Sequence, residues 1–235
     1  MSNQKLIKGY AQFNDQFRNV LKGTDNGGYA MGADNDFQIV KWSILGSPNL
    51  FDSPVQSINY VECHDNHTFY DKLTISTNYS DSVKMEYSDF ALHLVIISQG
   101  IPFIHAGQEF YRSKNGVENS YKSNDSINAI KWGPRLTSVD KLKKLIKIRK
   151  EHPVYHQKHY LENGEVKEVN SLIEYVLKNG EYTLTHYLKN DHKTNILDLE
   201  GKRLIFASHD FLLAGVDKIK INKPGVYIVK ENKKS

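Results

Sequence analysis

The sequence contains a single cysteine, Cys63, among 235 residues. One cysteine excludes an internal disulfide and a zinc-finger pattern. No apolar run reaches the length of a transmembrane helix, and the opening residues MSNQKLIKGY lack the apolar core of a signal peptide. We therefore expect no membrane span, no disulfide framework and a cytoplasmic location.

The sequence also lacks a strong charge imbalance. Its 31 Lys and Arg residues against 27 Asp and Glu residues give a net charge of +4, and much of the excess lies in KLKKLIKIRK and in the final KENKKS. A solvated helix face and a chain end explain such runs better than a nucleic-acid footprint, so we expect no nucleic-acid partner. The hydrophobic content of 39% is sufficient for a buried core.

Residues 1–152 alternate between helical and strand-like patterns. Apolar residues recur at helical spacing in 13–23, 35–46, 81–100 and 138–150, and the first three of these segments end in glycine. Two short apolar runs, 57–62 and 101–107, are typical of buried strands. The order helix, strand, helix, strand, helix predicts a parallel α/β arrangement.

After Pro153 the pattern changes to short β-rich runs. SLIEYVLKNGEYTLTHYL contains two such runs joined by Asn179-Gly180, a strong signal for a two-residue hairpin turn. Further short strands follow, separated by turn residues. We predict a second domain, residues 153–235, folded as an antiparallel β-sandwich.

Polar side chains follow both predicted parallel strands. His64, Asp65 and Asn66 follow the first strand, and His105 and Glu109 follow the second. The carboxyl ends of parallel strands meet at one edge of a sheet, where α/β barrels place their chemistry. A turn at Asp65-Asn66 and a hydrogen-bonded core histidine at position 105 are the structural alternatives. Two polar clusters at successive strand ends favour a functional site.

The motif YVECHDNHTFYDKL, starting at Tyr60, strongly resembles the fourth sequence region of type I pullulanases, which belong to the α-amylase superfamily of glycoside hydrolases. ISQGIPFIHAGQEFYRSKNGVENSYKSNDSINAIKW and FNDQFRNVLKG resemble the segments on either side of that region. The resemblance runs in order over residues 10–153. It implies an enzyme that hydrolyses α-1,6-glucosidic linkages in pullulan, starch or glycogen with retention of configuration.

The resemblance also implies roles for individual residues. Asp65 corresponds to the catalytic carboxylate that stabilises the transition state, and His64 corresponds to the histidine that binds the sugar at the cleavage subsite. An ionised carboxylate suits that role because it accepts hydroxyl hydrogen bonds near the developing oxocarbenium charge. Further substrate-binding positions implied by the resemblance, with a solvated turn-rich loop as the alternative for the last four, are Asn66, Asn119, Tyr121, Asp125 and Asn128.

Two carboxylates that a retaining glycosidase requires are missing from the sequence. The family carries its nucleophile in an Arg-x-Asp segment and its acid in a Gly-Glu-Gly segment, and neither pattern occurs here. We therefore expect residues 1–152 to be the C-terminal part of a (β/α)8 barrel whose earlier strands hold both groups. An improvised site built from Glu62, Asp65 and Glu109 has nothing to keep one carboxyl protonated. The isolated chain is predicted to be inactive.

The expected partners are an α-glucan and the missing N-terminal part of the enzyme. Open barrel strands also predict self-association, because unpaired edges and apolar faces are left uncovered. Calcium is implied only by the resemblance, and the sequence shows no closed set of oxygen ligands for it or for another metal. The alternative function is a non-catalytic module that binds α-glucan or has a structural role.

Overall fold

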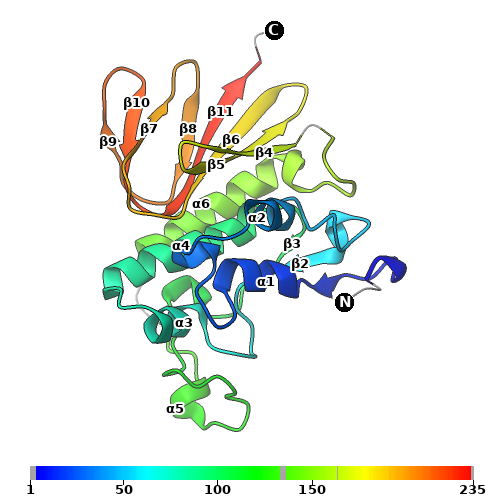
Figure 1. Cartoon of the computed structure of the whole chain (residues 1–235), viewed down its shortest axis with the longest axis vertical. Helices are drawn as coiled ribbons and strands as arrows, with labels where there is room; N and C mark the ends of the chain where they lie inside the picture. The colour runs from blue at the N-terminus through cyan, green and yellow to red at the C-terminus, as the bar shows by residue number, and fades with distance from the viewer. Residues whose placement is uncertain (1–3, 133–135, 163, 234–235) are drawn as a thin grey trace.

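The structure is a computed structural model that describes residues 4–132, 136–162 and 164–233. Figure 1 shows a helical layer, with a short parallel sheet beside it, packed against a layer of antiparallel strands. The helices are α1 (Asp15–Lys22), α2 (Phe37–Ile44), α3 (Phe69–Ser76), α4 (Asp81–Ile97), α5 (Asp125–Asn128) and α6 (Thr137–Glu151). Single turns of 3-10 helix occur at Gln4–Leu6, Tyr29–Met31, Pro54–Gln56, Gln108–Phe110 and Pro153–Tyr155.

Side-chain caps explain where four of the helices begin. The side chain of Asn14 accepts a hydrogen bond from the amide of Phe17 at the start of α1. Asp36, Thr68 and Ser80 cap α2, α3 and α4 in the same way. Such caps satisfy amides that have no partner within a helix. The expected helices over 13–23, 35–46, 81–100 and 138–150 are all present, while no periodicity noted in the sequence indicated α3.

Three strands form a parallel sheet in the order β1-β2-β3. They are β1 (Gln12–Phe13), β2 (Ser57–Asn59) and β3 (Ile101–Pro102). The register pairs Gln12 with Ser57 and Ile58 with Ile101. The parallel arrangement is confirmed, but the strands over 57–62 and 101–107 are shorter than expected and β1 is an additional strand. Within the described residues the sheet stays open at β1 and β3, so the complete barrel is not shown.

The C-terminal strands form two antiparallel sheets. The larger sheet has the order β4-β5-β6-β11-β8 and the smaller β7-β10-β9. A hydrophobic cluster that includes Tyr187, Leu197 and Tyr227 draws its residues from both sheets. The strands are β4 (Glu165–Val169), β5 (Leu172–Lys178), β6 (Tyr182–Lys189), β7 (Asn195–Asp198), β8 (Arg203–Ala207), β9 (Leu212–Leu213), β10 (Lys218–Ile221) and β11 (Gly225–Asn232).

The predicted hairpin joins β5 to β6, with its turn one residue later than expected. The amide of Asn179 donates to the carbonyl of Tyr182 at 3.1 Å, so Gly180 and Glu181 form the tip. The side-chain oxygen of Asn179 accepts from the amides of Glu181 at 2.9 Å and Tyr182 at 2.8 Å. Asn179 therefore acts as the cap of the turn.

Helix α4 holds the helical layer and the larger antiparallel sheet together. Most of its side chains are buried, and it contacts α3 and α6 as well as β11. At this junction Nδ1 of His93 lies 2.8 Å from Oγ of Ser208. Glu86 pairs with His192 at 2.8 Å and with Lys223 at 2.9 Å. One hydrophobic core thus includes residues from both 1–152 and 153–235.

Candidate functional site

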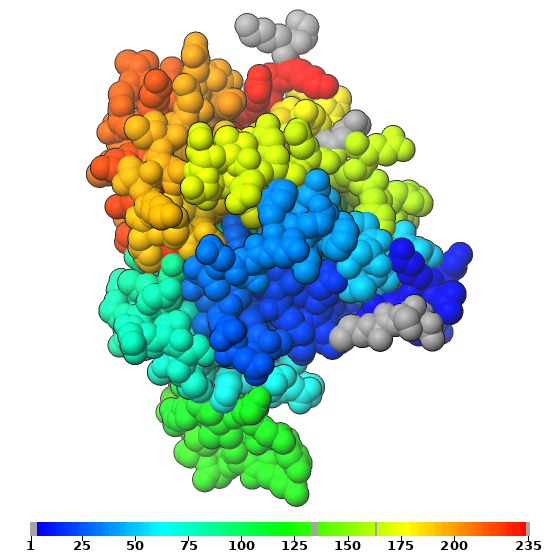
Figure 2. Space-filling view, in the orientation of Figure 1, coloured from blue at the N-terminus to red at the C-terminus, as the bar shows by residue number. Residues whose placement is uncertain are grey.

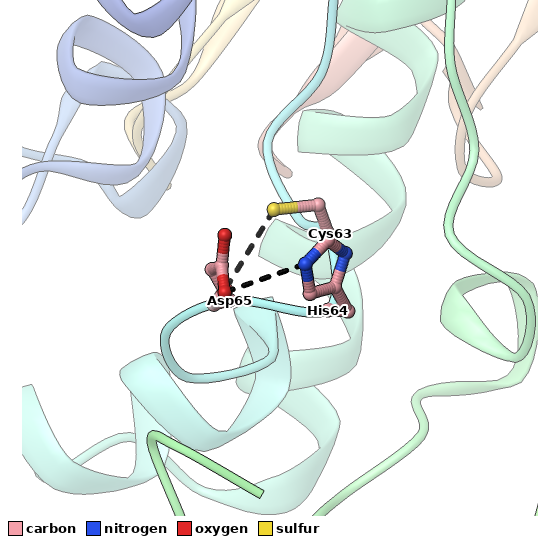
Figure 3. Close-up of side chains that lie close together, drawn as sticks. All are labelled: Cys63, His64 and Asp65. Carbon is pink, nitrogen blue, oxygen red and sulfur yellow. Dashed lines mark hydrogen bonds and ion pairs between the residues drawn. The ribbon is translucent and has the colours of Figure 1, made fainter. Parts of the chain in front are cut away.

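The segment after β2 presents the motif CHDNH as an exposed turn. Tyr60 to Cys63 are buried, and the chain then reaches the surface at His64, whose side chain is 84% exposed, and Asp65, whose side chain is 69% exposed. The two side chains face each other, with Nε2 of His64 3.4 Å from a carboxylate oxygen of Asp65 (Figure 3). Asn66 adopts a left-handed backbone with φ of 64°, which returns the chain toward α3. We call residues 64–67 the catalytic-motif loop, after the motif whose catalytic role the family resemblance implies.

Glu62 is a buried residue that holds the segments around this loop in place. Its carboxylate is 2% exposed and accepts from Nδ1 of His105 at 2.8 Å and from the amide of Phe69 at 2.7 Å. The first contact joins the segments that follow β2 and β3, which confirms that the two polar clusters are neighbours. Glu62 lies beyond β2, which ends at Asn59, and is one of the three carboxylates considered for an improvised site. Glu62 is instead a buried structural carboxylate.

The other candidate acids near this edge are also engaged. Glu109 accepts from the amide of Gly107 at 2.9 Å. Asp71 accepts from Oγ of Ser113 at 2.6 Å and from the amide of Lys114 at 2.7 Å. Asp65 differs from Glu62 and Glu109, because its carboxylate is exposed and its side-chain partner, His64, is exposed as well. This arrangement offers one ionisable carboxylate and one imidazole to a ligand.

The remaining predicted substrate residues lie on the loop after β3 and on α5. This segment stands out from the body of the molecule in Figures 1 and 2. Asn119, Tyr121 and Asp125 are exposed. Asn128 is half-buried, and its side-chain amide donates to the carbonyls of Ser120 and Ser123, so it shapes the loop. Among the described residues, no hydrogen bond connects these four side chains to His64 or Asp65.

A polar cavity of about 480 Å³ lies beside the catalytic-motif loop. It is lined by Asn66 and His67 of the loop and by Glu118, the neighbour of Asn119. Cationic side chains also line it, and no pattern in the sequence had singled them out: Arg18, Lys22 and Lys72. Arg18 and Lys22 are four residues apart on α1 and therefore lie on the same helix face. That spacing was the signal available in the sequence.

Two buried lysines flank the loop. Lys22 is 4% exposed, and burial lowers its pKa to about 8. Lys114 is 3% exposed, and burial lowers its pKa as well. Glu62 and Cys63 are close enough to both ammonium groups to oppose these shifts. Burying a cation costs free energy. Two buried lysines beside the loop therefore indicate a specific role there.

Cys63, His64 and Asp65 form the only side-chain group in the described residues with the composition of a small metal site. Their ligand atoms lie within 4.8 Å of one another (Figure 3). The ammonium groups of Lys22 and Lys114 act on Cys63 from close range and oppose the approach of a divalent cation. We therefore assign no metal to this group.

Comparison with known proteins gives consistent relatives, although no family model matches the chain. A curated pullulanase of Bacillus subtilis is 41% identical over 169 residues, which are 66% of this chain and 24% of the relative. The pullulanase of Anoxybacillus sp. LM18-11 in complex with maltotetraose superposes with a TM-score of 0.86 at 33% identity, covering 98% of this chain and 36% of that one.

A pullulanase mutant from Paenibacillus barengoltzii, also with maltotetraose, gives a TM-score of 0.90 at 30% identity and covers 99% of this chain and 40% of that one. The resemblance to pullulanases is confirmed. The chain spans about a quarter of the length of the curated Bacillus relative and at most two fifths of the two solved structures. The match is to one part of each relative.

Proposed function

We propose that this chain, which resembles one part of the pullulanases, supplies the transition-state-stabilising carboxylate of a debranching glycoside hydrolase. The reaction is hydrolysis of α-1,6-glucosidic linkages in pullulan, starch or glycogen with retention of configuration. The observation that carries the proposal is the exposed Asp65 carboxylate on the segment that follows parallel strand β2, within a stretch that matches pullulanases. The assignments of residues 1–152 to the C-terminal part of a (β/α)8 barrel and of residues 153–235 to a β-sandwich domain belong to the same proposal.

The proposed chemistry follows from the two exposed groups. An ionised Asp65 accepts hydrogen bonds from sugar hydroxyls, and its charge stabilises the positive charge that develops on the sugar ring. His64 donates a hydrogen bond to the same sugar. Their 3.4 Å separation lets both groups contact one residue of the glucan. The contacts strengthen as the ring distorts, so they lower the barrier more than they improve ground-state binding.

The nucleophile and the acid come, in this proposal, from sequence outside the 235 residues. A retaining glycosidase needs two carboxyl groups about 5–5.5 Å apart on the two sides of the scissile bond. Here Glu62 and Glu109 already accept hydrogen bonds from neighbouring groups, and neither is a substitute. The isolated chain should therefore be inactive, and its partner is the missing N-terminal part of the enzyme.

The proposed ligand is an α-glucan, as in the relatives whose structures contain maltotriose or maltotetraose. The cavity beside the loop and the exposed side chains of Asn66, Asn119, Tyr121 and Asp125 offer donors and acceptors for sugar hydroxyls. Asn128 would act indirectly by holding its loop. Calcium, which only the family resemblance implies, is not part of this proposal.

A two-component assay tests this proposal. The chain is mixed with a recombinant protein that carries the preceding part of the Bacillus relative, and release of reducing ends from pullulan is measured. We expect hydrolysis from the mixture and none from either component. Hydrolysis by the isolated chain that disappears in Asp65→Asn would contradict the proposal and support an improvised site.

A non-catalytic α-glucan-binding or structural module is the second candidate. It is favoured by the engagement of Glu62 and Glu109, which leaves Asp65 without a second free acid at this edge. In that case calorimetry detects binding of maltotetraose by the isolated chain, and the two-component mixture stays inactive although the components associate. Activity in the mixture excludes this candidate.

A further inference from the structure

The two ends of the catalytic-motif loop are each held by a buried lysine. Nζ of Lys22, on α1, donates to the carbonyl of His67. Nζ of Lys114, on the loop after β3, donates to the carbonyl of His64 at 3.0 Å. The two lysines come from elements that flank the loop on opposite sides in sequence. Between the two carbonyls lie Asp65 and Asn66, so the exposed carboxylate sits on a turn fixed at both ends.

Neither contact is needed to satisfy a buried carboxylate. The described residues contain no ion pair between Lys22 or Lys114 and an acidic side chain, and both ammonium groups bind main-chain oxygen. Burying an ammonium group without such a pair is costly. An aliphatic side chain could fill the same space without that cost. The hydrogen bonds to the loop are therefore the specific contribution of these residues.

We propose that Lys22 and Lys114 are positioning residues, which fix the catalytic-motif loop so that Asp65 is held in the orientation its chemistry requires. The inference rests on the proposed function for the role of Asp65 but not for the clamp itself. A hydrogen bond from a charged donor is stronger than one between neutral groups, which suits a lysine for this task. Asn66, whose backbone is left-handed, lies between the two anchored carbonyls.

The surroundings of the two lysines make the clamp sensitive to pH. The charged and titratable groups that face Lys22 are Glu62, Cys63, Arg18 and Lys72, with Asp25, His67 and Glu118 around the adjoining cavity. Those facing Lys114 are Arg112, Glu62, Cys63 and Asp71. Because burial brings the pKa of Lys22 to about 8, this end of the loop loses its charged donor under mildly alkaline conditions.

Cys63 provides a direct readout of loop opening in the protein alone. It is the only cysteine, it is 8% exposed, and it adjoins the loop. We expect Lys22→Met and Lys114→Met each to raise the rate of Cys63 alkylation by iodoacetamide about 10- to 100-fold at pH 7, the range expected for loss of a charged hydrogen bond. Loss of a nearby positive charge by itself disfavours a thiolate, so faster alkylation reports opening of the loop.

The matched control is Lys72→Met. Lys72 lines the same cavity, but its ammonium group donates to the carbonyls of Thr24 and Asp25 and not to the loop. Its removal should leave the alkylation rate unchanged. An alkylation rate in Lys22→Met that equals the wild-type rate would overturn the clamp. Equal acceleration in Lys72→Met would show a general loosening and would also overturn it.

A pH series separates positioning from general stability and remains available if the Met variants fail to fold. Carbon-13 NMR relaxation should show that residues 64–67 become less ordered as the pH rises through about 8. Lys22→Arg keeps its charge over this range, so its loop should stay ordered. The unfolded state keeps its lysine protons up to about pH 10.5, so the contribution of Lys22 to global stability rises between pH 8 and pH 10.5. A loop that stays ordered through this range in the wild type would contradict the proposal.

Activity of the two-component enzyme provides a second test of the clamp. There Lys22→Met should lower kcat about 10- to 100-fold with little change in KM, and Lys22→Arg should restore most of the loss. Faster alkylation with unchanged kcat would mean that the clamp exists and that the proposed role of Asp65 is wrong. Unchanged alkylation contradicts the clamp whatever the activity shows.

Discussion

Arg149 joins three segments around the start of β3, and its removal should strongly destabilise the protein. The residue is 7% exposed and belongs to α6. Its guanidinium donates to four main-chain carbonyls: Ile96 at 2.6 Å, Ser98 at 2.8 Å, Gly100 at 2.7 Å and Tyr155 at 3.1 Å. These contacts cover the end of α4, the turn into β3 and the 3-10 turn after α6.

The magnitude follows from the groups left without partners. Arg149→Met fills much of the same volume but leaves these buried carbonyls without a donor. Each hydrogen bond to a charged group contributes about 1.5–3 kcal/mol, and the costs are not additive within one network. Desolvation of the guanidinium, which also lowers its pKa, offsets part of the gain. We expect a loss of about 3–5 kcal/mol in the free energy of unfolding, and about half of that for Arg149→Lys.

Denaturant unfolding followed by tryptophan fluorescence and by circular dichroism measures this change. Arg203→Met is the matched control, because Arg203 is exposed on β8, and its effect should stay within about 0.5 kcal/mol. A loss below about 1 kcal/mol for Arg149→Met would refute the reasoning. It would mean that water replaces the guanidinium at the four carbonyls without loss.

Three further predictions concern the turn, a buried acid and the open sheet. Asn179→Ala removes two hydrogen bonds from the hairpin tip and should lower the free energy of unfolding by about 1 kcal/mol, measured by denaturation against wild type. Burial raises the pKa of Asp89 to about 7, so its contribution to the free energy of unfolding is present at pH 4 and is lost as the pH rises to 7. Asp89→Asn should remove this pH dependence. A variant whose free energy of unfolding follows pH as in the wild type would contradict the prediction. Phe13, 46% exposed on edge strand β1 of the open parallel sheet, should drive self-association, so that sedimentation velocity shows weaker association for Phe13→Ser than for the wild type; equal association would contradict this prediction.

Much of the helical and sandwich structure could be predicted because it follows from local patterns. Helical spacing, terminal glycines and Asn179-Gly180 are local signals, and the corresponding helices and hairpin are present. The parallel strands were harder to predict, because β1 and β3 have only two residues each and their pairing depends on distant segments. Strand length in this sheet is a property of tertiary contacts.

The same distinction applies to the site. The proximity of the two polar clusters could be predicted, because each cluster follows one of two neighbouring parallel strands. The clamp by Lys22 and Lys114 joins residues 45 and 50 positions from their carbonyl partners, so no sequence window contains it. Its lysines also look like ordinary solvated positions in the sequence. Only packing shows that they are buried.

The central claim is that Asp65 acts in the transition state of a reaction whose nucleophile and acid lie outside this chain. The most direct test is the turnover of the two-component enzyme on pullulan with Asp65→Asn, beside Glu109→Gln as the control. Glu109 is a carboxylate at the neighbouring strand end that accepts from the amide of Gly107. We predict that Asp65→Asn lowers kcat by about 100- to 1,000-fold with little change in KM, while Glu109→Gln stays within a few fold of wild type. Near-normal turnover of the Asp65→Asn enzyme would contradict the claim.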